Sequence, residues 1–166
     1  MTPHNNIYLF CEAIQSGKTT QLQQWLRNKT NHVSGVLTPD KDGRRLLYDI
    51  ARDEYHELEA PENTPDEEVQ MIGKFRFCKE GFDKAQEILK RSLEENTEWM
   101  VIDEVGKLEL DEGRGLEPTV GEVIRFYQGG EAKGKLILVI RNYLLDEAVE
   151  RYGLNRDLLI HKNFFE

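Results

Sequence analysis

The chain has 166 residues, of which 22 are basic and 31 are acidic, so its formal net charge is −9. This charge argues against nucleic acid or an anionic membrane as a general partner and favours a soluble protein. Cys11 and Cys78 form neither a metal-ligand spacing nor a disulfide framework, and the four histidines do not have the spacing of a zinc site. No segment has the length of a membrane span or the pattern of a secretory signal. We therefore expect a cytoplasmic protein with the length of one α/β domain and no membrane partner.

The first predicted strand, Ile7–Cys11, leads into a loop that ends in Gly17, Lys18 and Thr19, and a helix is predicted over residues 18–29. Strand, loop and helix in this order are typical of a phosphate-binding P-loop. In such a loop backbone N–H groups hold the β-phosphate, the lysine reaches the β and γ oxygens, and the threonine hydroxyl binds Mg²⁺. The alternative is an ordinary helix N-terminus capped by Ser16. The residues predicted to bind the nucleotide are Glu12, Ala13, Ile14, Gln15, Ser16, Gly17, Lys18, Thr19 and Thr20.

Glu12 departs from the P-loop pattern, because that pattern has a glycine at the first position of the loop. A non-glycine residue at positive φ costs about 1–3 kcal/mol, and a carboxylate directed at the phosphates would cost more. We expect the Glu12 side chain to point away from the phosphates, toward solvent or toward a basic residue such as Arg141. The loop is then a modified one.

The remaining elements follow from apolar periodicity and from turn residues. In chain order they are a strand at Val33–Leu37, a β-hairpin of Arg45–Ile50 and Glu54–Leu58, an acidic connector at Pro61–Glu68, a strand at Phe75–Cys78, a helix at Gly81–Glu95, a strand at Trp99–Ile102, a glycine-rich insertion at Asp111–Gly115, a helix at Thr119–Tyr127, a strand at Lys135–Ile140, a helix at Leu144–Tyr152 and a short strand within Asp157–Phe164. The hairpin is expected to project from the sheet edge, and Phe75 and Phe77 to face the core together. The alternation predicts a single α/β domain over residues 1–166, with a mostly parallel sheet flanked by helices and an inserted β-hairpin.

A second motif lies where the apolar run Trp99–Ile102 ends in Asp103 and Glu104. A buried parallel strand presents acidic residues in this way at its carboxyl end. In a P-loop enzyme this is the Walker B strand, in which Asp103 binds Mg²⁺ and Glu104 is the general base for the attacking water. The alternative is a buried strand followed by a solvated acidic turn. Arg141 ends the strand Lys135–Ile140 and is either a charge-stabilising arginine near the γ-phosphate or a plain polar strand end.

The segment Val101–Leu110, V-I-D-E-V-G-K-L-E-L, resembles the I-D-E-I-G-K-M-E-L signature of the THEP1-type nucleoside-triphosphatases, a family of small P-loop proteins. Gly35–Pro39 with Arg44 and Arg45, and Ile72–Phe77 with Phe82, are similar to further segments of that family. The resemblance covers most of residues 6–152 and departs at Glu12 and at the insertion. It implies a P-loop nucleoside-triphosphatase fold.

Four charged side chains near these motifs, in two pairs, have two interpretations each. Lys107 and Glu109 match the family signature, and they either support the loop around Glu104, which is the favoured interpretation, or pair with each other on the surface. Arg45 and its neighbour Arg44 either reach a substrate phosphate or lie at the tip of the hairpin, and the second interpretation is the safer one.

Two classes of function remain open. The first is Mg²⁺-dependent hydrolysis of nucleoside 5'-triphosphates, ATP, GTP and others, to diphosphate and phosphate, with Glu104 and Lys18 as catalytic residues and Thr19 and Asp103 as metal ligands. The second is a nucleotide-binding switch module or a small-molecule phosphotransferase with weak or no hydrolysis. Glu104 favours hydrolysis and Glu12 favours the binding module. A nucleoside triphosphate is the expected partner in both, and the sequence names neither a protein partner nor a base preference.

Overall fold

The computed structural model describes residues 6–12, 17–29 and 32–165, with the backbone alone described for Glu12 and Lys18. Residues 13–16, which belong to the predicted phosphate-binding loop, lie outside the described residues. Within the described ranges, no helix combines the length and the apolarity needed to cross a bilayer.

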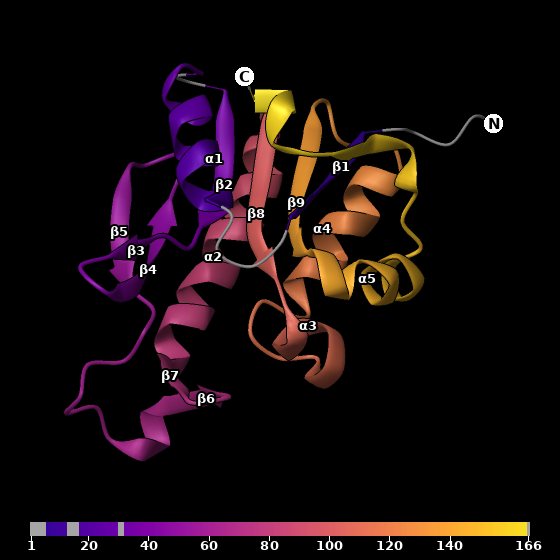
Figure 1. The fold of residues 1–166 in the computed structure, drawn as a ribbon. Helices are drawn as coiled ribbons and strands as arrows, with labels where there is room; N and C mark the ends of the chain where they lie inside the picture. Colours follow the sequence, from indigo (N-terminus) through magenta and orange to yellow (C-terminus); the bar gives the residue numbers. More distant parts are fainter. Residues whose placement is uncertain (1–5, 13–16, 30–31, 166) are drawn as a thin grey trace.

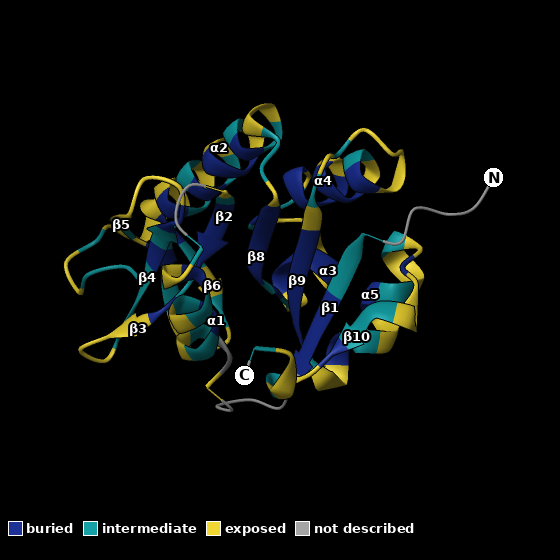
Figure 2. Ribbon diagram, turned by 90° about the horizontal axis from the view of Figure 1, so that it is seen from above, coloured by how far each residue is buried: buried dark blue, intermediate teal, exposed yellow. Residues whose placement is uncertain are grey.

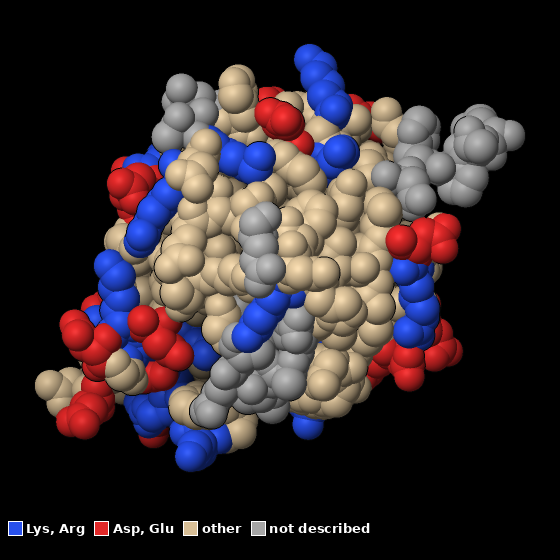
Figure 3. Space-filling model, turned by 45° about the horizontal axis from the view of Figure 1, so that its top comes forward, with Lys and Arg blue, Asp and Glu red and all other residues tan. Residues whose placement is uncertain are grey.

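Basic and acidic side chains lie interspersed along the margins of the face seen in Figure 3, with other residues between them.

A mostly parallel sheet forms the centre of the molecule (Figure 1), as predicted. Its strands lie in the order β10 (Leu159–Ile160), β1 (Ile7–Glu12), β9 (Lys135–Arg141), β8 (Trp99–Val105), β2 (Val33–Leu37), β4 (Arg44–Asp49) and β3 (Asp40–Lys41). The strands from β10 to β2 run parallel to one another, and β4 is antiparallel to β2. β8 and β9 consist largely of apolar residues because both of their faces are covered. Because β1, β9 and β8 are parallel neighbours, the carboxyl ends of these three strands meet at one edge of the sheet.

Helices cover both faces of this sheet (Figure 2). On one face lie α2 (Lys79–Glu95), α4 (Thr119–Gln128) and α5 (Leu145–Tyr152), whose buried residues pack against those of the strands. On the other face lie α1 (Lys18–Arg27) and the C-terminal turn Lys162–Phe165. Leu22 and Leu26 of α1 contact this second core, in which Trp25, Trp99 and the C-terminal phenylalanines pack their rings together. The C-terminal turn is thus part of the layer that carries α1.

The predicted β-hairpin is present, but it continues the sheet and does not project from it. β4 pairs antiparallel with β5 (Glu54–Glu57) and also with β2, where Val36 lies opposite Asp49. The prediction missed this second pairing because the partner strand is distant in sequence. The hairpin therefore extends the central sheet by antiparallel strands.

A second, unpredicted hairpin stands apart from the central sheet. It consists of β6 (Val69–Ile72) and β7 (Phe75–Cys78), which pair antiparallel as a two-stranded sheet. Two backbone hydrogen bonds of 2.7 Å attach it to the segment after β5: Cys78 N–H donates to the Leu58 carbonyl, and Ala60 N–H donates to the Arg76 carbonyl. The acidic connector before β6 ends in a 3-10 turn at Asp66–Glu68. In Figure 1 the hairpin lies below the rest of the fold, beside the start of α2.

Three further expectations were wrong in part. Phe77 is buried against Phe82 of α2, but Phe75 is 50% exposed because it lies at the free end of the hairpin, beyond the helix. A helix that was not predicted, α3 (Lys107–Glu112), includes the first two residues of the segment predicted as a glycine-rich insertion. The last predicted strand is only the two-residue β10, with 3-10 turns at Arg156–Leu158 and Lys162–Phe165 on either side.

A buried ion pair fastens α2 to β4. Nη2 of Arg91 donates to both carboxylate oxygens of Asp49 at 2.7 Å, and Asp49 is fully buried. Burial would lower the pKa of the Arg91 guanidinium, but the hydrogen bond and the charge of Asp49 raise this pKa overall. Arg91 is therefore the cation that allows a carboxylate to be buried at this position.

We expect Arg91→Leu to lower the free energy of unfolding by roughly 3–5 kcal/mol, because it leaves the Asp49 carboxylate buried without its cation. Urea unfolding followed by circular dichroism measures this loss. The matched control is Glu95→Gln, since Glu95 is the exposed partner of Arg91 at 3.3 Å and is expected to contribute about 1 kcal/mol or less. Equal losses of stability in the two variants would contradict the role of Arg91 as the cation that balances the buried Asp49 carboxylate.

Candidate active site

The carboxyl ends of β1, β8 and β9 lie next to the start of α1, and the predicted site residues gather there. Gly17 directly precedes α1 with a φ of 83°, a left-handed conformation that glycine adopts without strain. Its carbonyl accepts a hydrogen bond from Gln21 N–H at 3.0 Å, which starts the helix. The predicted roles of residues 13–16 and of the Glu12 and Lys18 side chains lie outside the described residues. These roles stay predictions.

The two predicted metal ligands are in direct contact. Thr19 Oγ1 donates a hydrogen bond of 2.8 Å to Oδ2 of Asp103, which also accepts the backbone N–H of Thr38 at 3.3 Å. Asp103 is 1% exposed. A hydroxyl and a carboxylate are the hard oxygen ligands that Mg²⁺ prefers, so this pair fits the predicted cation. Thr38 was not predicted for the site, although it is the first polar residue after the apolar strand β2 and so reaches the same sheet edge.

Glu104, the predicted general base, forms an ion pair with Arg141. Oε1 of Glu104 lies 3.0 Å from Nε of Arg141, and the two side chains are 17% and 29% exposed. The pairing of β8 with β9 shifts at this point, because Asp103 lies opposite Val139 whereas Val105 lies opposite Ile140. Glu104 is the extra residue of this β-bulge, a feature that redirects a side chain at the end of a strand. Burial would lower the pKa of Arg141, but the Glu104 charge raises it overall.

Glu109 supports the loop after β8 from within. Its Oε1 accepts the Gly106 N–H at 2.8 Å and its Oε2 accepts the Leu116 N–H at 3.1 Å, so one carboxylate joins the N-cap of α3 to the segment that follows the helix. A Cβ atom at Gly115, which has a φ of 67°, would lie 2.1 Å from Oε2, so only glycine fits beside this carboxylate. Glu109 is 4% exposed, whereas Lys107 is exposed. The interpretation of these two residues as a surface pair is therefore wrong.

Most of the site residues described above line one cleft of about 1070 Å³. The predicted residues that line it are Gly17, Thr19, Thr20, Asp103, Glu104 and Arg141. Arg45 lines it as well, whereas Arg44 lies 3.8 Å from Glu57 on the hairpin. Arg45 also pairs with Asp40 of β3 at 3.4 Å, as a residue of the hairpin, and its contact with a substrate phosphate stays a prediction. The far side of the cleft is formed by α2 and the hairpin of β6 and β7, which the sequence did not place near the site.

Comparison with known proteins identifies the family. A family model described as NTPase matches residues 8–159. The chain belongs to this family. The match confirms the resemblance that the segment Val101–Leu110 carries.

Two solved structures resemble that of this NTPase-family chain. The crystal structure of THEP1 from the hyperthermophile Aquifex aeolicus has a TM-score of 0.69 and 16% identical residues, and the alignment covers 93% of this chain and 87% of that one. The solution structure of a human cancer-related nucleoside triphosphatase has a TM-score of 0.56 and 19% identical residues, with 93% and 86% covered. A search of curated protein sequences found no match. The structural similarity confirms the predicted P-loop nucleoside-triphosphatase fold.

Burial raises the pKa of Glu109 to about 7, although the hydrogen bonds from Gly106 and Leu116 act in the opposite direction and the charge of Glu104 adds to the rise. The folded protein then binds more protons than the unfolded chain between the ordinary glutamate pKa, roughly 4.5, and pH 7. The free energy of unfolding should therefore fall as the pH rises through this range, by on the order of 3 kcal/mol from this one group.

We expect Glu109→Gln to remove this decline, because glutamine does not titrate. Urea unfolding of both proteins from pH 4.5 to pH 8 measures the slope, and the slope is the readout because the amide changes the absolute stability as well. Glu112→Gln, at the exposed end of the same helix, should keep the slope of the parent protein. Parallel profiles of the parent and Glu109→Gln would show that Glu109 ionises normally.

Proposed function

We propose that this chain is a single P-loop domain that catalyses the Mg²⁺-dependent hydrolysis of nucleoside 5'-triphosphates to diphosphate and phosphate. The observation that carries the proposal is the contact of 2.8 Å between Thr19 Oγ1 and Asp103 Oδ2, which joins the start of α1 to the end of β8. Membership of the NTPase family supports the same activity.

Thr19 and Asp103 would hold the Mg²⁺, since both offer oxygen ligands and Asp103 brings the charge. When bound, Mg²⁺ neutralises charge on the β- and γ-phosphate oxygens. The backbone N–H groups of the loop and the N-terminus of α1 would bind the β-phosphate, and Lys18 would reach the β and γ oxygens. These contacts address phosphate and metal rather than a base, so we expect activity on ATP, GTP and other nucleoside triphosphates.

Glu104 would take a proton from the attacking water, and Arg141 would neutralise the charge that develops on the γ-phosphate oxygens. Both line the cleft, and their ion pair of 3.0 Å keeps the two groups at its polar end. Glu109 would hold the loop that carries Glu104, through its hydrogen bonds to Gly106 and Leu116. Glu109 thus acts on Glu104 only through the backbone of this loop, so it is a positioning residue.

The test is phosphate release from ATP, GTP, CTP and UTP, with Mg²⁺ and with EDTA in its place, together with a titration of nucleotide binding. We expect release from all four triphosphates with Mg²⁺ and none with EDTA. Binding without release in the presence of Mg²⁺ would support a nucleotide-binding switch module instead. Absence of both binding and release would overturn the proposal.

A further inference from the structure

The cleft continues well beyond the groups that hydrolysis needs. It extends from Thr19 and Glu104 past Glu109 to the hairpin of β6 and β7, with a volume of about 1070 Å³. One water molecule occupies roughly 30 Å³, whereas sites for small organic ligands have roughly 300–1,000 Å³. The groups that would bind a triphosphate and an attacking water, Thr19, Asp103 and Glu104, all belong to the polar end. The cleft therefore has room for a second ligand next to Glu104.

Much of the lining of the remaining part, beside the hairpin, is apolar, and the charged residues Glu59 and Lys74 lie beside it on the segments of Leu58 and Phe75. The apolar residues are Leu58, Phe77, Phe82, Ala85 and Leu116, and each of them is buried or half-buried. Leucine and phenylalanine side chains offer nothing to a phosphate or to a water molecule, but they suit the flat apolar body of a small ligand. The wall and the catalytic carboxylate belong to one continuous cavity. A molecule that lies on this wall would therefore share one cavity with Glu104.

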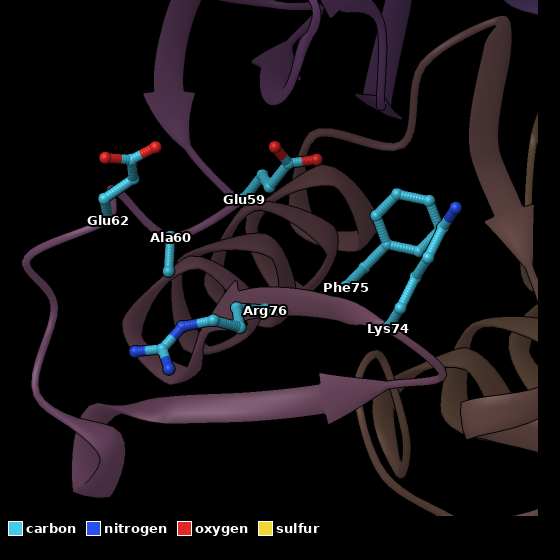
Figure 4. A pocket seen from close by; sticks show the side chains of 6 residues that line it. All are labelled: Glu59, Ala60, Glu62, Lys74, Phe75 and Arg76. Atoms are coloured by element: carbon cyan, nitrogen blue, oxygen red, sulfur yellow. The ribbon is translucent and has the colours of Figure 1, made fainter.

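Phe75 is an exposed aromatic ring at the rim of this wall. It is 50% exposed, and it lines both the cleft and a smaller outer hollow of about 290 Å³. Figure 4 shows Phe75 and Lys74 extending together from the end of the hairpin, with Glu59 across from them. Nζ of Lys74 lies 5.6 Å from the centre of the Phe75 ring. A half-exposed aromatic ring at the mouth of an apolar cavity is suited to stack on a second ring.

We propose that the apolar part of the cleft binds a small molecule with an aromatic body and a hydroxyl group, and that the γ-phosphoryl group is transferred to this hydroxyl. The inference rests on the proposed function, because it uses the same loop, metal ligands and Glu104. The hydroxyl oxygen forms a bond to the γ-phosphorus, and its proton goes to the Glu104 carboxylate. The bond between the γ-phosphorus and the β–γ bridging oxygen breaks, and the nucleoside diphosphate leaves with that bond's electron pair. Water in place of the hydroxyl gives hydrolysis.

The test follows the radiolabel of [γ-³²P]ATP with Mg²⁺ in the presence of adenosine, uridine, pyridoxine, thiamine or 2-(1-naphthyl)ethanol. These probes share an aromatic body and a primary hydroxyl. Thin-layer chromatography separates the organic phosphate ester from free phosphate. We expect a labelled ester from at least one probe, and we expect Phe75→Ala to lower the ratio of ester to phosphate about tenfold through the loss of stacking.

Met71→Ala is the matched control, because Met71 lies on the same hairpin and is 49% exposed but does not line the cleft. This variant should keep the parent ratio. Free phosphate as the sole product with every probe would overturn the inference and leave the proposed hydrolysis standing. Ester formation that Phe75→Ala and Met71→Ala reduce equally would overturn the assignment to this wall. If nothing is released or bound without a probe, the proposed function itself has failed.

Discussion

Glu104→Gln is expected to lower turnover by about 10²-fold or more while the affinity for a nucleoside triphosphate stays close to that of the parent protein. Glutamine keeps the length of the side chain and an oxygen that can accept a hydrogen bond from Arg141 Nε, which lies 3.0 Å from the carboxylate. It cannot take a proton from the attacking water. The variant thus tests the proton transfer to Glu104 separately from the contribution of Glu104 to nucleotide binding.

Single-turnover phosphate release and a fluorescence titration with a labelled triphosphate measure the two quantities independently. Glu112→Gln serves as the control, because Glu112 is exposed at the end of α3 and should leave both values unchanged. If affinity and rate fall by the same factor in Glu104→Gln, then Glu104 contributes to binding and is not the base.

Asp103→Asn is expected to raise the Mg²⁺ concentration needed for activity and to lower turnover by about 10²-fold or more, because it removes the charge that would bind the cation. Asparagine keeps an oxygen that can accept the Thr19 hydroxyl and the Thr38 N–H, which both donate to Oδ2 in the parent protein. We therefore expect the fold to persist in this variant.

Phosphate release measured as a function of Mg²⁺ concentration, with thermal unfolding as a check on the fold, provides the result. Asp83→Asn, at an exposed position on α2, is the matched control and should show the parent Mg²⁺ dependence. An unchanged Mg²⁺ dependence in Asp103→Asn would mean that the cation is held elsewhere.

The contact between Thr19 and Asp103 could be anticipated from the sequence because Asp103 directly follows one continuous apolar run, and Thr19 lies at the start of the helix that the loop joins to another such run. Such runs identify buried parallel strands, and the carboxyl ends of these strands share one edge of the sheet. For the same reason the strand at Val33–Leu37 was predicted with its observed bounds. The ion pair between Glu104 and Arg141 was not predicted, although each residue was assigned to this edge, because β9 lies between β1 and β8 and periodicity alone does not give the order of strands.

The far wall of the cleft could not be anticipated, because its position depends on contacts between segments without a strong local pattern. Phe75 and Phe77 share one face of a strand. Phe77 is buried because it packs against Phe82 near the start of α2, whereas Phe75 lies beyond the helix and is exposed. Glutamate is seldom buried, so the residue type alone does not indicate that Glu109 lies in the interior. The spacing of Gly106 and Glu109 was a usable signal, since a glutamate three residues after a helix N-cap is typical of a capping contact.

The attachment of the second hairpin has a consequence for binding entropy. Cys78 N–H and Ala60 N–H tie β7 to the segment after β5 with hydrogen bonds of 2.7 Å, and the other edge of β7 is paired with β6. Fixing the backbone of one residue opposes association by about 1–2 kcal/mol when it must occur on binding. Here the backbone behind the apolar wall is ordered by the fold itself. A molecule that enters the cleft thus meets a surface of fixed shape, and its affinity depends on how well it fits that shape rather than on its ability to order the chain.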